Sequence, residues 1–260
     1  MPTLKPIVLV TGASAGLGAA LGAAFAERRH GVVLVARREA QLATVADGIA
    51  ARGCERPHIV ALDLTLPDAG ERLARTLQEM GLEPEVVVNN AGFGLLGQAA
   101  SLDRARQLAM VDLNVRIATE LSLRFVDSLK RHKGGILNVA SVVGFVPGPG
   151  MAVYHATKAY LVSFSLALNQ ELKSQGVRVT VLCPGPVDTE FGVRATGFLS
   201  RTLTRSVERV VREGVEGFMR GEAVVIPGRN NKMLSLLPRF LPRSVVLAII
   251  GASKRQTIED

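Results

Sequence analysis

Short runs of apolar, β-branched residues alternate along the chain with longer stretches in which apolar residues recur at helical spacing. The short runs predict strands at residues 7–10, 32–36, 58–62, 86–89, 135–140, 178–182 and 223–226. Several of these runs show hardly any alternation, as expected when both faces of a sheet are covered. The longer stretches predict helices, among them residues 17–29, 39–52, 69–80, 103–129 and 154–172.

Regular alternation of strand and helix favours right-handed crossovers, and hence a parallel sheet with helices on both faces. We therefore predict an α/β fold, a Rossmann-like doubly wound sheet of about seven strands that forms a single domain over residues 1–260. In such sheets ligands bind beyond the carboxyl ends of the strands, so we expect the functional residues there.

The composition indicates the class of protein and its compartment. With 260 residues, 48% apolar and 21% charged, the chain can bury a large core. Its two cysteines, Cys54 and Cys183, lack metal-ligand spacing, which indicates reduced thiols and no metal site. The sequence has neither the core of a signal peptide nor an uninterrupted apolar run of about 20 residues. We expect a cytoplasmic protein.

Positive charge is concentrated in the last quarter of the chain. The net charge is +8, and residues 194–260 hold twelve Lys or Arg against six Asp or Glu. A basic surface attracts anions such as nucleotides or acidic lipids, although a solvated face is the simpler alternative. Nucleic-acid binding is not expected, because aromatic residues are 4% and there is no block of basic residues.

The first predicted strand runs into a glycine-rich turn, Thr11-Gly12-Ala13-Ser14-Ala15-Gly16-Leu17-Gly18, and then into a helix. Glycines let the backbone approach a pyrophosphate, and a helix N-terminus presents free N–H groups to it. The spacing G-x-x-x-G-x-G differs from the general G-x-G-x-x-G fingerprint, so a purely structural turn is the alternative.

The second predicted strand ends in Ala36-Arg37-Arg38, where an acidic residue would accept hydrogen bonds from an adenosine ribose. Two guanidiniums would suit a 2′-phosphate instead, so we predict NADP(H) over NAD(H). The alternative is that these arginines simply begin a surface helix. Asp63, after the third strand, could accept a hydrogen bond from the adenine amino group or cap the following turn.

Tyr154 and Lys158 stand four residues apart in a predicted helix and therefore share one face. A phenol ordinarily keeps its proton until about pH 10. A neighbouring ammonium group would favour the phenolate and make the tyrosine a usable general acid or base. Such a pair also arises by chance in many helices, so its meaning depends on the rest of the sequence.

Further motifs follow in a characteristic order. They are Thr11-Gly12-x-x-x-Gly16-x-Gly18, Asn89-Asn90-Ala91-Gly92, Asn114, Ser141, Tyr154-x-x-x-Lys158 and Pro184-Gly185. Over about residues 5–190 the chain resembles the short-chain dehydrogenase/reductase family. Its tail is similar to those of the branch that groups 3-ketoacyl reductases with DltE-like reductases.

The resemblance implies roles for individual residues. Tyr154 would exchange the proton, Ser141 would bind the substrate oxygen, Lys158 would hold the nicotinamide ribose and lower the pKa of Tyr154, and Asn114 would hold a water molecule in a proton relay. The implied cofactor-binding residues are Gly12, Ser14, Gly16, Leu17, Gly18, Arg37, Arg38, Asp63, Leu64, Asn90, Ala91, Tyr154, Lys158, Pro184, Gly185, Val187 and Thr189.

Three residues near these motifs are given no part in the chemistry. Ile117 stands where many family members have glycine, which bears on the packing of its helix. His155, beside Tyr154, should point away from the catalytic face and is interpreted as incidental. Tyr160 is also expected to serve packing.

The implied activity is hydride transfer between NADP(H) and a carbonyl compound or alcohol. Apolar residues in the loop 142–152, including Val143, Phe145 and Met151, and a substrate lid at about 190–215 favour an apolar or acyl-like substrate. Two other function classes are alternatives. A non-catalytic NADP(H)-binding sensor or scaffold should have lost Ser141, Tyr154 or Lys158, and a sugar-nucleotide epimerase needs a larger C-terminal region.

The apolar tail at about 230–252 is expected to form a subunit interface or a lid over the site. Peripheral contact with an anionic membrane is the less favoured alternative. The resemblance also implies a homodimer or homotetramer.

Overall fold

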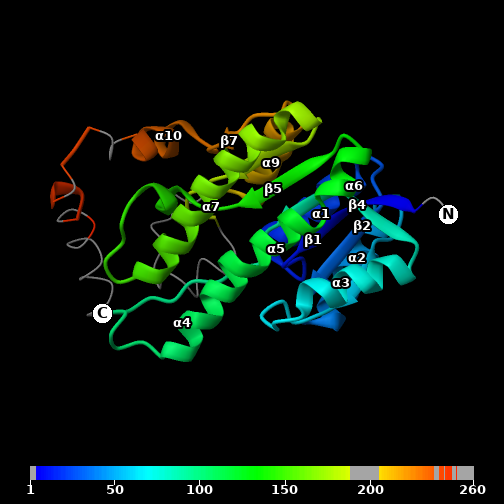
Figure 1. Ribbon diagram of the computed structural model, residues 1–260, viewed down its shortest axis with the longest axis horizontal. Helices are drawn as coiled ribbons and strands as arrows, with labels where there is room; N and C mark the ends of the chain where they lie inside the picture. The colour runs from blue at the N-terminus through cyan, green and yellow to red at the C-terminus, as the bar shows by residue number, and fades with distance from the viewer. Residues whose placement is uncertain (1–3, 188–204, 237–239, 243, 248–249, 251–260) are drawn as a thin grey trace.

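Seven parallel strands form one sheet in the order β3-β2-β1-β4-β5-β6-β7 (Figure 1). This computed structural model describes residues 4–187, 205–236, 240–242, 244–247 and 250. The strands are β1 Lys5–Thr11, β2 Val32–Ala36, β3 His58–Ala61, β4 Leu82–Asn89, β5 Gly135–Val139, β6 Arg178–Leu182 and β7 Val224–Val225. The predicted doubly wound α/β fold is confirmed.

Helices connect the strands and cover both faces of the sheet. They are α1 Gly16–Ala26, α2 Glu39–Ala50, α3 Ala69–Glu79, α4 Arg104–Val111, α5 Ile117–Arg124, α6 Val126–Arg131, α7 Ala152–Leu172, α9 Val207–Met219 and α10 Arg229–Leu236. Shorter turns are the π-helical η1 Asp112–Arg116 and the 3-10 turns η2 Val142–Phe145 and η3 Lys173–Gln175.

Alternate residues of each central strand enter two different cores. Val8 and Val10 of β1 pack in the core that includes α1, α2 and α9. Ile7 and Leu9 pack in the core that includes α3, α5, α6 and α7. All four side chains are fully buried, which explains why the strand reads as a continuous apolar run.

The helix predicted over residues 103–129 is not continuous. The π-helical turn η1 separates α4 from α5, and Phe125 separates α5 from α6. An inserted π turn changes the direction of the side chains around it, and such turns are frequent at functional sites. Hydrophobic spacing does not reveal it, because α4 and α5 continue the apolar pattern on either side. Ile117 begins α5 with its side chain buried in the core.

The predicted lid and tail lie only partly within the described residues. From Val207 onward the lid region forms α9, whose Val210, Val215 and Phe218 are fully buried in the core. Residues 207–215 therefore belong to the folded core, whereas 190–204 lie outside the described residues. The tail begins as α10, which packs against η2. Of the helices that the structure describes, none has both the length and the apolar character to cross a membrane.

Two carboxylates of β4 form ion pairs near the start of that strand. His30 Nδ1 lies 2.6 Å from Glu85 Oε1, and His132 Nε2 lies 2.8 Å from Glu83 Oε1. Glu83 also pairs with Arg131. The hydrogen bond from His30 outweighs the opposing effect of burial and holds the pKa of Glu85 below its ordinary value. Glu85 therefore stabilises the fold through its charged form.

Replacing Glu85 with Gln should lower the free energy of unfolding by about 1 kcal/mol at about pH 6. Because the pKa of folded Glu85 is depressed, the stabilisation is present above the pKa of the unfolded chain and disappears as the pH falls through the folded pKa. Urea unfolding of both proteins from about pH 6 down to about pH 3 measures this difference. A difference in the free energy of unfolding that does not change with pH would contradict the role of charged Glu85. The control is Glu79→Gln, a change at the exposed end of α3.

Candidate active site

The glycine-rich turn connects β1 to α1 in a tight conformation that depends on its glycines. Gly12 and Gly16 have φ of 65° and 56°, in the left-handed region that glycine adopts without strain. A Cβ atom on Gly18 would overlap the Gly12 carbonyl. Ala15, which has no polar side chain, stands at the N-cap of α1. The first N–H groups of α1 are therefore available to an anion, as a pyrophosphate site requires.

Asn90 and Thr11 fix this turn to the end of β4. Asn90 Nδ2 donates to the carbonyls of Thr11 (2.9 Å) and Gly12 (3.2 Å). Thr11 Oγ1 accepts from the backbone N–H groups of Asn90 (3.0 Å) and Ala91 (3.1 Å). Asn90 was predicted to line the cofactor groove, and the structure shows that it also holds the turn in shape. The part played by Thr11 was missed, since a hydroxyl at a strand end has many possible uses.

The two arginines after β2 lie beside the glycine-rich turn. Arg38 Nη2 donates to Ser14 Oγ (3.1 Å), and Arg37 Nη1 lies 4.0 Å from Asp63 Oδ2. The Arg37 side chain is 73% exposed. Arg38 is the N-cap of α2, so these residues do begin a helix. They also place one guanidinium against the glycine-rich turn and the other beside Asp63.

Asp63 caps the turn after β3. Its Oδ1 accepts from the Thr65 N–H (3.0 Å) and the Thr65 hydroxyl (2.8 Å). Burial favours the neutral acid, but the two hydrogen bonds from Thr65 and the charge of Arg37 outweigh it and lower the pKa of Asp63. The Leu64 side chain is buried in the core. Any contact of Leu64 with a cofactor would therefore be made by its backbone.

Tyr154 and Lys158 lie on one face of α7, with exposed fractions of 7% and 4%. Lys158 Nζ donates to the Val139 carbonyl at the end of β5 (2.8 Å) and lies 5.8 Å from the centre of the Tyr154 ring. Burial disfavours the ammonium form and lowers the pKa of Lys158 to about 8. The tyrosine predicted to exchange the proton and the lysine predicted to hold the ribose thus lie together at the end of β5.

The expectation that Lys158 lowers the pKa of Tyr154 is wrong for the protein groups alone. Burial raises the pKa of Tyr154 well above its ordinary value, and a hydrogen bond from Ser141 opposes this only in part. Lys158 Nζ lies over the ring, 5.8 Å from its centre, and burial remains the dominant influence on the phenol. Tyr154 is therefore fully protonated near neutral pH.

Ser141 connects the end of β5 to the end of β6. Its hydroxyl lies within hydrogen-bond reach of Tyr154 and of the Pro184 carbonyl (3.3 Å). A Cβ on the next residue, Gly185, would come within 2.6 Å of the Asn231 amide. Asn231 belongs to α10 and donates to the Pro227 carbonyl (2.7 Å). The tail thus contributes a residue next to Pro184-Gly185, which no motif in the sequence indicated.

Asn114 occupies the π-helical turn with 1% exposure. Its Nδ2 donates to the Phe93 carbonyl and to Thr157 Oγ1, both at 3.0 Å, and its Oδ1 accepts from the Phe93 N–H (3.1 Å). Asn114 therefore joins the Asn89-Asn90-Ala91-Gly92 segment to α7. Its role in a proton relay remains a prediction.

The last two residues predicted to contact the cofactor are Val187 and Thr189. Val187 pairs with Arg205 in an isolated β-bridge, and its side chain is buried in the core. Thr189 lies outside the described residues.

His155 is not incidental. Its Nδ1 lies 2.9 Å from the Val146 carbonyl, and its ring lies edge-on to Tyr154, with ring centres 6.3 Å apart. The ring also fills the space in front of Gly148, where a Cβ would overlap it. His155 therefore holds the loop between Ser141 and Tyr154. Gly148 is buried in that loop, and nothing in the sequence marked its contact with His155.

A parallel sheet, a glycine-rich turn at its first strand end and a buried Tyr–Lys pair beside a serine define an oxidoreductase of the nicotinamide-dependent Rossmann type. The chain belongs to the short-chain dehydrogenase family, whose model matches residues 6–197.

Several known proteins are similar to this chain. A sulfoacetaldehyde reductase of Chromohalobacter salexigens is 33% identical over 237 residues, which cover 89% of this chain and 93% of the relative. A serine 3-dehydrogenase of Agrobacterium fabrum is 34% identical over 192 residues, 73% of this chain and 75% of the relative. A short-chain dehydrogenase of Sphingobium yanoikuyae, solved in complex with NADPH, has a TM-score of 0.78 and 31% identity, and the match covers 92% of this chain and 97% of that one.

Replacing Gly148 with Ala should lower the free energy of unfolding by about 1–3 kcal/mol, because the new methyl group meets the His155 ring. His155→Ala should cost about 2 kcal/mol, from a lost buried ring and a lost hydrogen bond. In the double variant the methyl group has room, so the combined loss should be smaller than the sum. Urea unfolding of the four proteins measures the coupling, and strictly additive losses would contradict the contact.

Proposed function

We propose that this protein is an NADP(H)-dependent oxidoreductase that transfers a hydride between nicotinamide and a carbonyl compound or alcohol. The observation that carries the proposal is the buried Tyr154 phenol, which lies within hydrogen-bond reach of Ser141 and whose ring centre lies 5.8 Å from Lys158 Nζ. A non-catalytic sensor would not require this arrangement.

The residues at the strand ends fit a dinucleotide. Gly12 and Gly18 leave no room for a Cβ, so the turn packs tightly against Asn90 and Ala91 and brings the start of α1 to the end of the strands. The N–H groups at the start of α1 would bind the pyrophosphate, and Lys158 would bind the nicotinamide ribose. Pro184 and Gly185, held by Ser141 and Asn231, would support the nicotinamide. When bound, NADP(H) supplies or accepts the hydride.

The side chains of the site handle the proton. Ser141 would bind the substrate oxygen and stabilise negative charge that develops there. Tyr154, kept protonated by burial, would donate its proton to that oxygen during reduction and become a phenolate. In the reverse direction this phenolate would take the proton of the alcohol. Lys158, whose pKa of about 8 leaves it mostly charged near neutral pH, would stabilise the phenolate that remains.

The preference for NADP(H) is supported by Arg37 and Arg38. Both follow β2 where the ribose of the adenosine half is expected, and Arg38 contacts Ser14 in the glycine-rich turn. A 2′-phosphate there would gain charge-assisted hydrogen bonds, whereas a 2′-hydroxyl would find no acidic side chain at residues 36–38.

Replacing Arg38 with Ala should weaken NADPH binding about 10- to 100-fold, because a charge-assisted hydrogen bond is lost. NADH binding should change much less. Fluorescence titration with both cofactors measures the two effects, and Arg52→Ala, which removes a guanidinium paired with Glu27, is the matched control. Tighter binding of NADH than NADPH by the unaltered chain would contradict the preference.

Most of the described side chains around Tyr154 are apolar, which supports an apolar or acyl-like substrate. The residues that lie around Tyr154 on this side are Leu95, Gly97, Ala99, Leu102, Gln107, Met110, Met151, Ala152 and Val153, of which only Gln107 is polar. None of these described residues is a cation that could bind a sulfonate or carboxylate. The two curated relatives carry names of small polar substrates, so their substrates belong in the test.

In an assay of NADPH oxidation, we expect the chain to reduce bulky ketones or 3-oxoacyl thioesters faster than sulfoacetaldehyde. Tyr154→Phe should lower kcat about 10²- to 10⁴-fold with little change in NADPH affinity, because it removes the proton donor. Tyr160→Phe, the same change on an exposed tyrosine of α7, is the control.

Two outcomes would contradict the proposal at different levels. A Tyr154→Phe protein with undiminished activity would exclude Tyr154 as the proton donor. Preference for small, charged carbonyl compounds would leave the mechanism standing and exclude the apolar substrate.

Three further expectations belong to the proposal. The homodimer or homotetramer is supported by large apolar side chains exposed on α5 and α7, among them Leu123 (52%) and Leu166 (40%). A cytoplasmic location is supported by the free thiols of Cys54 and Cys183. The place of the chain in the branch of 3-ketoacyl and DltE-like reductases remains a prediction that the substrate panel tests.

A further inference from the structure

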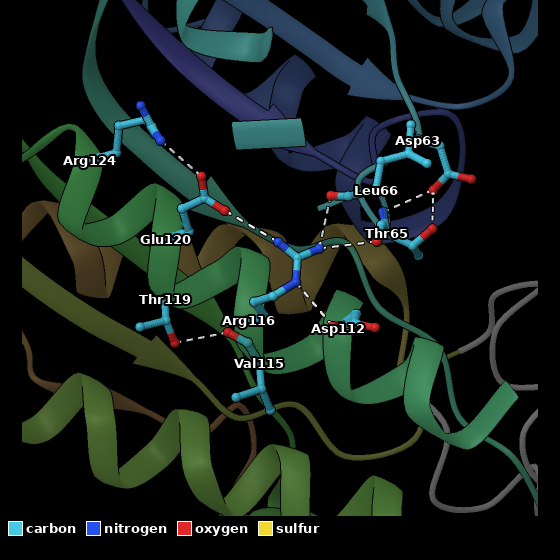
Figure 2. Close-up of polar contacts among 9 residues, drawn as sticks. All are labelled: Asp63, Thr65, Leu66, Asp112, Val115, Arg116, Thr119, Glu120 and Arg124. Carbon is cyan, nitrogen blue, oxygen red and sulfur yellow. Dashed lines mark hydrogen bonds and ion pairs between the residues drawn. The ribbon is translucent and has the colours of Figure 1, made fainter. Parts of the chain in front are cut away.

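Arg116 makes contacts that the proposed chemistry does not use. It is the last residue of the π-helical turn η1, and Figure 2 shows its guanidinium pointing toward the loop after β3. Its Nη2 donates to two consecutive backbone carbonyls of that loop, Thr65 (3.1 Å) and Leu66 (3.0 Å). Thr65 and Leu66 are about fifty residues away in the sequence, so the contact joins two separate connections of the sheet.

The loop that Arg116 holds begins with Asp63, for which a hydrogen bond to the adenine amino group is one of two predicted roles. Asp63 accepts two hydrogen bonds from Thr65, as Figure 2 also shows. The side chain of Asp63 thus binds a backbone N–H group of the loop, and Arg116 binds two of its backbone carbonyl groups. Arg37 lies 4.0 Å from Asp63, so the same loop adjoins the expected site of the 2′-phosphate.

Two carboxylates orient the guanidinium. Arg116 Nε donates to Asp112 Oδ1 (3.0 Å), and Nη1 lies 3.4 Å from Glu120 Oε2. Glu120 also accepts from Arg124 (3.1 Å). Because the three nitrogens of Arg116 have different partners, the planar group is held in one orientation. A Lys ammonium could keep the charge but could not make all these contacts in the same geometry.

The same π-helical turn carries Asn114, whose amide binds Phe93 and Thr157. One turn of the chain therefore contacts the loop of the adenine side through Arg116 and the catalytic helix α7 through Asn114.

We propose that Arg116 is a positioning residue for the cofactor, which sets the loop 63–66 in the conformation that binds the adenosine half of NADP(H). The inference rests on the proposed function, because it requires that the site bind this dinucleotide. Arg116 acts through the loop backbone and touches neither substrate nor the reacting atoms.

The test uses 2′,5′-ADP, which has the adenosine half of NADP and no nicotinamide, together with NADPH. Arg116→Gln should raise the Kd of 2′,5′-ADP and the KM of NADPH about 5- to 20-fold, while kcat at saturating NADPH changes less than about 2-fold. Arg116→Lys should lie between the variant and the unaltered chain. Isothermal titration gives the Kd, and steady-state kinetics give the separate effects on KM and kcat.

Arg124→Gln is the matched control, because it removes the other guanidinium bound to Glu120 and leaves the loop contacts in place. It should bind 2′,5′-ADP as the unaltered chain does. Equal binding by Arg116→Gln and the unaltered chain, or an equal loss in Arg124→Gln, would overturn the inference alone. An unaltered chain that binds neither ligand would overturn the proposed function, and the inference with it.

Discussion

The burial of an ammonium group beside a phenol is the constraint on which the rest of the site depends. Lys158 is 4% exposed, and its Nζ donates to the Val139 carbonyl. A buried cation is costly unless polar groups surround it. The ends of parallel strands supply such groups, since carbonyls beyond the last ladder hydrogen bond need another donor. This is a physical reason for the cation to lie at the carboxyl edge of the sheet.

Burial acts on the two titratable groups in opposite directions. It lowers the pKa of Lys158 toward neutrality and raises that of Tyr154. Both shifts favour the neutral form, so the protein groups alone hold Tyr154 as an acid that keeps its proton. The Ser141 hydrogen bond favours the phenolate. A substrate oxygen bound by Ser141 and Tyr154 would therefore compete directly for these hydrogen bonds.

The sequence predicted the parts of the molecule that follow from local pattern. The strands were evident because their alternate residues, such as Leu9 and Val10, enter separate cores and leave no polar face. The glycine-rich turn and the Tyr154–Lys158 pair were evident because their chemistry requires fixed residue types at fixed spacing. The contacts of Asn231 and His155 were not predicted, since they depend on where α10 and the loop before α7 come to lie.

The π-helical turn η1 shows most clearly why some features of the structure could not be predicted from the sequence. Hydrophobic spacing runs through residues 103–129 as though one helix filled them, and the extra residue of η1 leaves no mark in composition. Yet Asn114 and Arg116 of this turn have different partners, one on α7 and the other on the loop after β3. Positions two apart on a helix point to nearly opposite sides, so Asn114 and Arg116 contact different elements. Through these two side chains one short segment joins α7 to the loop after β3.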